Sequence, residues 1–171
     1  MSELVDLYSE KKEKTGKVMS KDNPFPPNMF YLTAHIWIYK DGYWLIQKRA
    51  LSKKVNPGIW SVTGGTVKAG ENSLEGAVRE LKEELNIEVP TEQLRYIGTY
   101  LQKYAFVDVY FLELRKNLKN ISFDRQEVTE VEWATFSEIL EKNSMHTFAD
   151  CVTPGLLMII KNQNENNNEK N

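Results

Sequence analysis

Three glutamates and one arginine stand close together in the segment Arg79-Glu80-Leu81-Lys82-Glu83-Glu84. Glu83 and Glu84 follow Glu80 by three and four residues, so the three carboxylates are neighbours if the segment is helical. Like charges at this spacing destabilise a helix by about 0.2–0.5 kcal/mol per pair. A divalent cation, Mg²⁺ above all, would relieve this repulsion because it prefers oxygen ligands of this kind. The alternative explanation is a solvated acidic helix face.

The segment from Leu74 to Leu85 has the periodicity of an amphipathic helix that would carry these glutamates. Its apolar residues recur at helical spacing and are Leu74, Ala77, Val78, Leu81 and Leu85. At about 100° per residue, the glutamates are expected to share a wall roughly opposite this stripe. Gly76 is expected on the same wall, where it would leave room for a ligand.

The residues around this helix have a fixed spacing. Gly65 is followed after five residues by Glu71, and after seven more by the run from Arg79 to Ile87. This pattern resembles the Nudix box, the signature of the Nudix hydrolase family (G-x5-E-x7-R-E-U-x-E-E-x-G-U, with U aliphatic). Only the late glycine differs, because Asn86 stands there. We expect Asn86 to end the helix in the left-handed conformation, where Asn commonly replaces Gly.

The resemblance implies a Mg²⁺-dependent hydrolase, with Mn²⁺ as a second candidate metal. Its substrate would be a nucleoside diphosphate derivative or a related organic diphosphate, cleaved by in-line attack of water. The resemblance assigns the metal ions to Glu80, Glu83 and Glu84. Arg79 is expected to orient acidic side chains through charge-assisted hydrogen bonds, and Glu71 to brace the loop before the helix. The general base would be one carboxylate of this set or one from a later loop.

Glycines and positive charge flank the box. Gly64 and Gly65 would let backbone N–H groups approach metal-bound phosphate. Arg49 and Lys53 are candidates for binding substrate phosphate, with solubility of an edge strand as the alternative role. Glu127 is a candidate for an extra metal ligand or base, or else a surface carboxylate.

Several aromatic residues could face either a substrate or the core. Phe25, Tyr31 and Tyr104 are candidates for stacking on a nucleoside, and His35 is expected to be a core histidine within an apolar strand. Buried aromatic side chains dominate protein cores. We therefore assign three tryptophans to the core: Trp44, Trp60 and Trp133.

The segments QKRALSKK and NPGIW and the N-terminal extension are similar to the branch of the Nudix superfamily that contains isopentenyl-diphosphate isomerases. Arg49 and Lys53 match the isomerase spacing for diphosphate contacts. Those isomerases use a cysteine just after the Trp-containing strand, beside metal-binding histidines. Residues 60–66 contain neither type, Tyr31 stands roughly where a histidine would be, and the box is intact. The site therefore resembles a hydrolase, with an isomerase-like enzyme and a non-catalytic nucleotide-binding module as alternatives.

Length and composition limit the class of protein. At 171 residues and 41% hydrophobic content, the chain can form one core, so we expect a single domain. A formal net charge of −2 with scattered lysines argues against nucleic-acid polymers and membranes as partners. The single Cys151, the charged N-terminus and the lack of a long apolar run predict a cytoplasmic protein. The expected partner is a small-molecule diphosphate, and a homodimer is left open.

Strand and helix patterns predict an α+β fold: a Nudix-type α/β/α sandwich with a mixed β-sheet and an N-terminal β-hairpin extension. The domain is expected over residues 1–161, with the hairpin and a proline-rich connector over residues 1–28. The Asn-rich segment 162–171 is expected to be a disordered polar tail.

Overall fold

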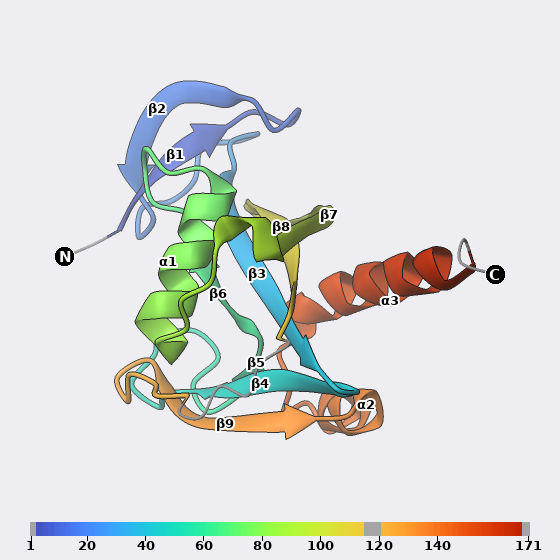
Figure 1. Ribbon diagram of the computed structural model, residues 1–171. Helices are drawn as coiled ribbons and strands as arrows, with labels where there is room; N and C mark the ends of the chain where they lie inside the picture. Colours follow the sequence, from blue (N-terminus) through green and yellow to red (C-terminus); the bar gives the residue numbers. More distant parts are fainter. Residues whose placement is uncertain (1–2, 115–120, 169–171) are drawn as a thin grey trace.

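The computed structural model describes residues 3–114 and 121–168 and shows a mixed β-sheet between helices (Figure 1). Within the described residues, seven strands follow the path β5–β4–β3–β8–β7, with β6 attached to β3 and β9 to β4. Their bounds are β3 Tyr31–Lys40, β4 Tyr43–Arg49, β5 Trp60–Ser61, β6 Thr63–Thr66, β7 Leu94–Gln102, β8 Ala105–Glu113 and β9 Val128–Ala134. β8 runs parallel to β3 and antiparallel to β7, so the sheet is mixed.

β3 and β4 form an antiparallel hairpin, with Lys40 paired to Tyr43. Asp41 and Gly42 form its turn and have φ values of 49° and 93°. A two-residue turn of type I′ needs positive φ at both central positions, and Asp-Gly is a favoured sequence for it.

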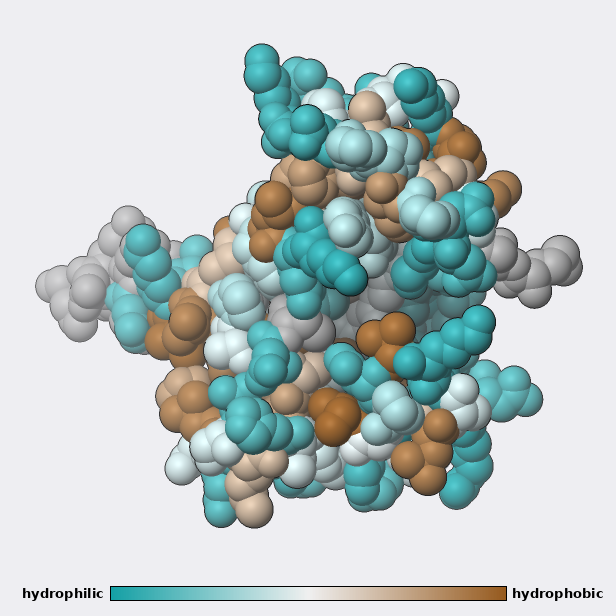
Figure 2. Space-filling view, turned by 180° about the vertical axis from the view of Figure 1, so that it is seen from behind, coloured by the Kyte–Doolittle hydropathy of each residue, from teal (hydrophilic) through white to brown (hydrophobic). Residues whose placement is uncertain are grey.

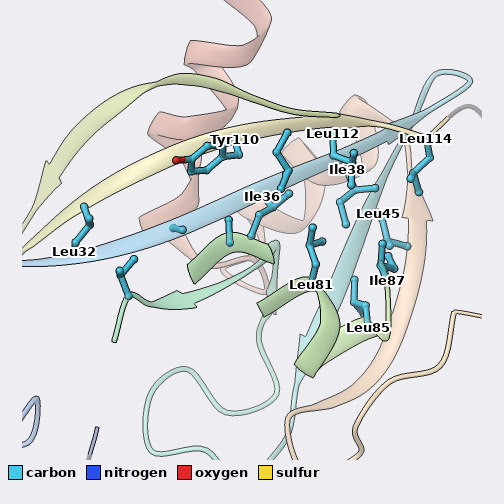
Figure 3. Close-up of a cluster of buried hydrophobic side chains, with 14 of the residues drawn as sticks. Leu32, Ile36, Ile38, Leu45, Leu81, Leu85, Ile87, Tyr110, Leu112 and Leu114 are labelled. Carbon is cyan, nitrogen blue, oxygen red and sulfur yellow. The ribbon is translucent and has the colours of Figure 1, made fainter. Parts of the chain in front are cut away.

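Helix α1 (Ser73–Leu85) covers one face of the sheet. Leu81 and Leu85 have no exposed surface and pack against Ile36, Ile38 and Leu45 (Figure 3). Full burial of a leucine side chain contributes about 1.5–3 kcal/mol. The apolar side of α1 therefore fixes the helix, and with it the acidic residues, against β3 and β4.

The other face of the sheet carries α2 (Phe136–Ser144) and α3 (Thr153–Asn168). Trp37 is fully buried there and meets Trp44 edge to face at a centroid distance of 5.7 Å. Leu156 and Ile159 of α3 complete this second cluster. Two short 3₁₀ helices, η1 (Thr91–Gln93) and η2 (Asp150–Val152), connect the main elements. The predicted α/β/α sandwich is confirmed.

The N-terminal extension forms the predicted hairpin of β1 (Leu4–Tyr8) and β2 (Lys14–Ser20), a separate two-stranded sheet beside the first turn of α1 (Figure 1). Backbone hydrogen bonds of 2.8 and 3.0 Å between Tyr8 and Phe30 attach β1 to the start of the domain. An ion pair between Lys12 and the buried Asp108 attaches the turn of the hairpin to β8.

The C-terminal segment differs from the prediction. Residues 162–168 continue α3 instead of forming a disordered tail, and residues 169–171 lie outside the described residues. The Arg95 guanidinium on β7 donates a hydrogen bond to Asn162, and Ile159 is fully buried. These tertiary contacts support a helix that the Asn-rich composition alone would not predict.

The surface seen in Figure 2 carries hydrophobic residues in small groups among hydrophilic ones. None of the helices in the described part of the chain is long and apolar enough to cross a membrane.

Candidate active site

The ends of α1 are fixed by its flanking residues. Asn72 caps the first turn by accepting a hydrogen bond from the Glu75 N–H, and the Glu75 side chain accepts one from the Asn72 N–H. This is a reciprocal capping box, which satisfies two N–H groups that a helix start leaves unpaired. At the other end Asn86 has φ 52°, which confirms the predicted left-handed cap.

The acidic wall of α1 lies elsewhere than predicted. Glu80 and Glu84 are only 8% and 4% exposed, whereas the side chain of Glu83 is 49% exposed. At about 100° per residue, Glu80 and Glu84 lie roughly 120° and 80° around the axis from the middle of the apolar stripe, on its flank. The expectation that they lie roughly opposite the stripe is therefore wrong. Glu84 contacts Gln47 of β4 and Gly64 of β6, and Glu80 lies against Gly65 of β6.

Glu84 is held by two donors from the sheet. Its Oε2 accepts a hydrogen bond of 2.7 Å from Gln47 Nε2 and one of 3.1 Å from the Gly64 N–H. Thr63 Oγ1 donates to the other end of the Gln47 amide at 3.1 Å. Burial raises the pKa of Glu84 from 4.5 to about 8, and the nearby charge of Glu80 adds to the rise. Burial therefore disfavours the ionised form of Glu84 when no cation is bound.

Gly65 is adapted to the carboxylate of Glu80. A Cβ atom at Gly65 would lie 2.5 Å from Glu80 Oε1, so any other residue type would displace this side chain. Burial raises the pKa of Glu80, and its hydrogen bond with Arg79 opposes that rise. The Gly64 N–H, expected to meet phosphate, is bonded to Glu84 in this structure.

Arg79 links the acidic residues of the box. Its Nε and Nη2 donate to the two carboxylate oxygens of Glu71 at 2.8 and 3.0 Å. Its Nη1 donates to Glu80 at 2.7 Å and to Glu83 at 2.9 Å. Glu71 also accepts from the Lys68 N–H at 2.9 Å, which closes the loop before α1. Arg79 thus contacts three acidic residues of the box, and its orienting role and the bracing role of Glu71 stay predictions.

A pocket of about 300 Å³ opens beside the box. Six carboxylates and one lysine line it: Glu3, Lys53, Glu80, Glu83, Glu84, Asp124 and Glu127. Lys53 and Glu127 form an ion pair at its rim. The structure thus brings both candidates next to the box glutamates, whereas Arg49 donates to the Val55 carbonyl at 3.1 Å. Burial raises the pKa of Glu84, and the charge of Arg49 opposes that rise.

Sequence reasoning missed Glu3 and Asp124. Glu3 comes from the N-terminal hairpin, and Asp124 from the loop before β9, where its N–H lies 3.4 Å from the Glu84 carbonyl. Neither residue belongs to a sequence motif, and both reach the pocket only because the folded chain brings their segments next to the box. Among the described residues, no three His, Cys, Asp or Glu side chains already form a metal centre. Glu80 and Glu83 are instead engaged by Arg79.

The aromatic candidates fall into two groups. Phe25 stacks on Tyr31 and Tyr104 at centroid distances of 5.0 and 5.9 Å, and Tyr104 is 46% exposed. His35 hydrogen-bonds Tyr100 through Nδ1 at 3.1 Å, and burial lowers the pKa of His35 to about 4. Trp44 and Trp60 are buried in the second hydrophobic cluster as expected, whereas Trp133 is only partly buried and packs against the first.

Comparison with known proteins agrees with this geometry. Residues 29–156 match the family model of the NUDIX domain, so the chain belongs to the Nudix family. Within this family it is a Nudix hydrolase, an enzyme of the class that cleaves small-molecule diphosphates and generally uses divalent metal ions.

Three relatives illustrate the similarity. An uncharacterised Nudix hydrolase of Listeria monocytogenes is 29% identical over 159 residues, which are 92% of this chain and 94% of the relative. An isopentenyl-diphosphate Δ-isomerase of Cereibacter sphaeroides is 32% identical over 156 residues, 85% of each chain. The crystal structure of DR0079 from Deinococcus radiodurans has a TM-score of 0.72 and 25% identity, covering 86% of this chain and 92% of that one.

Proposed function

We propose that this protein is a Mg²⁺-dependent hydrolase that cleaves the diphosphate linkage of a nucleoside diphosphate derivative or a related organic diphosphate. The observation that carries the proposal is the pair of buried carboxylates, Glu80 and Glu84, at the wall of an acidic pocket. Arg79 donates to Glu80, but the donors to Glu84 are the neutral Gln47 amide and the Gly64 N–H, and burial raises the pKa of both carboxylates. Such an arrangement is unfavourable for folding alone and favourable for binding a cation.

The donor set fits a hard divalent cation. All three box glutamates offer oxygen atoms to the pocket, and no sulfur or imidazole ligand lines it among the described residues. Oxygen-only ligation is typical of Mg²⁺, with Mn²⁺ as the next candidate. The proposal assigns the metal to Glu80, Glu83 and Glu84. When bound, the cation would neutralise phosphate oxygens and lower the pKa of a water molecule that attacks in line.

The remaining residues have positioning and proton-handling roles in the proposal. Arg79 keeps Glu80 and Glu71 in place because its guanidinium donates to both carboxylates and reduces the repulsion between them. Glu127, at the pocket rim, is available as a base for the attacking water once Lys53 turns from it to a substrate phosphate. The exchange would give Lys53 a phosphate in place of the Glu127 carboxylate as its ion-pair partner.

An isomerase acting on isopentenyl diphosphate is the second candidate, and the relative in Cereibacter sphaeroides favours it. Against it, residues 60–66 on β5 and β6 contain neither cysteine nor histidine. Ser61, Thr63 and Thr66 stand in this stretch, and their hydroxyl groups are far weaker acids than a thiol at neutral pH. The proton chemistry of the isomerase would therefore lack its usual residue.

The experiment is a substrate panel at neutral pH, with ADP-ribose, sugar nucleotides, nucleoside diphosphates and isopentenyl diphosphate, each with Mg²⁺, Mn²⁺ or EDTA. Products are followed by ³¹P NMR, and isopentenyl diphosphate is also followed in D₂O by ¹H NMR. We expect metal-dependent cleavage of at least one anhydride and no isomerisation. Absence of cleavage with every cation would refute the hydrolase proposal. Deuterium incorporation into isopentenyl diphosphate would support the isomerase instead.

The single cysteine and the scattered surface charge also support a cytoplasmic enzyme that acts without a nucleic-acid polymer or membrane partner.

A further inference from the structure

The N-terminal hairpin lies outside residues 29–156, which match the family domain, yet it contacts the loop of the Nudix box directly. The Leu4 carbonyl on β1 accepts a hydrogen bond of 2.8 Å from the Ala69 N–H. The Asp6 carboxylate, on the same strand, accepts one of 3.0 Å from the Gly70 N–H. Two consecutive N–H groups of the loop are thus held by β1.

Hydrogen bonds from the hairpin also reach Glu71 of the Nudix box. Lys14 on β2 donates to Asp6 at 2.7 Å and to the Glu71 carbonyl at 3.3 Å. Gly70 has φ 90°, a left-handed conformation that turns the chain back toward α1. Glu71 follows immediately and receives the Arg79 guanidinium on both oxygens. A short path of hydrogen bonds therefore runs from Asp6 through the loop backbone to the arginine that holds Glu80.

A second contact joins the hairpin to the pocket. Glu3, just before β1, is one of the carboxylates that line the pocket. Lys21, just after β2, lies 3.6 Å from Glu3 and donates a hydrogen bond to the Thr66 hydroxyl. The Thr66 carbonyl in turn accepts from Arg79 at 2.8 Å. Both ends of the hairpin therefore meet the segment that carries the box.

The hairpin has another anchor that does not involve the box. Lys12 pairs with Asp108 on β8, and Tyr8 pairs with Phe30. These contacts attach the hairpin to β8 and to the start of the domain. Asp6 instead contacts Gly70 of the loop and Lys14 of β2, which also donates to the Glu71 carbonyl, so Asp6 is placed to shape that loop.

We propose that the β1–β2 hairpin is part of the active site and that Asp6 is a positioning residue for the loop carrying Glu71. This inference rests on the proposed function, because the loop geometry matters for catalysis only if the box binds the metal. Asp6 touches no reacting atom in this scheme. It fixes Gly70 and Glu71, and through Arg79 it keeps Glu80 available for the cation.

The test compares Asp6→Ala with Asp6→Asn, which keeps an acceptor for the Gly70 N–H. Asp22→Ala is the matched control, because Asp22 is an exposed carboxylate of the same extension that does not line the pocket. Mn²⁺ affinity of the metal-free proteins is measured by electron paramagnetic resonance, and amide exchange of residues 67–72 by mass spectrometry. Thermal unfolding and steady-state kinetics complete the set.

For Asp6→Ala we expect faster exchange in residues 67–72 and an Mn²⁺ affinity lower by about 10-fold, as for other residues that support metal ligands. kcat should fall by a similar factor with little change in KM. Asp6→Asn should recover most of the affinity, and Asp22→Ala should match the wild type.

Wild-type Mn²⁺ affinity in a folded Asp6→Ala variant would overturn the inference, even if its melting temperature falls. Equal losses in Asp6→Ala and Asp22→Ala would also overturn it, because a general effect of the extension would explain both. If the wild type hydrolyses no substrate, the proposed function fails, while Mn²⁺ affinity and amide exchange still decide the role of Asp6.

Discussion

Replacing Glu84 with glutamine should stabilise the metal-free protein while it abolishes turnover. Glu84 is 4% exposed, and burial and the neighbouring Glu80 raise its pKa from 4.5 to about 8. A neutral glutamine keeps an oxygen that can accept from Gln47 and the Gly64 N–H without the buried negative charge. Glu84 would therefore serve metal binding, although its carboxylate destabilises the metal-free folded protein.

The size and sign of the effect follow from the proton linkage. Between pH 4.5 and 8 the unfolded carboxyl has lost its proton while the folded one retains it, so the free energy of unfolding falls as pH rises. At 1.36 kcal/mol per pH unit, the wild type without metal should lose about 2 kcal/mol between pH 6 and pH 8 through Glu84. For a chain of this size, that difference corresponds to about 4–8 °C in melting temperature.

The assay is thermal unfolding in EDTA at several pH values from 5.5 to 8.5, for wild type and Glu84→Gln. Glu92→Gln, which alters an exposed carboxylate on η1, is the matched control. The stability gain of Glu84→Gln over wild type should grow with pH and should shrink when Mg²⁺ is added to the wild type. Turnover of Glu84→Gln should fall by more than about 100-fold, since even residues that only support a metal ligand cost about 10–100-fold. If the melting temperatures of the wild type and Glu84→Gln change equally with pH, the raised pKa assigned to the buried Glu84 is refuted.

Three further substitutions test other parts of the site. Arg79→Lys cannot donate to both oxygens of Glu71, so kcat should fall by about 10–100-fold in steady-state kinetics, and wild-type kcat would contradict the linking role. Gly65→Ala places a methyl group against Glu80 and should destabilise the protein by about 1–3 kcal/mol in denaturant unfolding, with loss of activity. An unchanged midpoint and rate would show that the close approach is not required. Tyr104→Ala should raise KM about tenfold for nucleoside substrates and leave it unchanged for alkyl diphosphates, if the exposed ring stacks on a base; equal changes for both would exclude stacking.

The helix that carries the site could be predicted from the sequence because its signals are local. The spacing of Leu81 and Leu85 and the left-handed cap at Asn86 depend on neighbours a few residues away. These features stand in the structure as predicted.

Features that depend on distant parts of the chain could not be predicted in the same way. The burial of Glu84 involves its contact with Gln47 of β4, 37 residues earlier in the chain. The angular positions of residues around α1 contain no information about β4. Glu3 reaches the pocket only through the docking of the hairpin on the loop. The extension of α3 to Asn168 likewise depends on contacts with β7, such as that between Arg95 and Asn162.

The most direct test of the central claim is hydrolysis of the best panel substrate in H₂¹⁸O with Mg²⁺, followed by ³¹P NMR. If water attacks a phosphorus atom of the diphosphate with the help of a cation held by Glu80, Glu83 and Glu84, one product phosphate carries a single ¹⁸O atom. The reaction should stop in EDTA and in the Glu84→Gln variant. Cleavage that continues in EDTA, or products without ¹⁸O on phosphorus, would contradict a metal-dependent attack of water on the diphosphate.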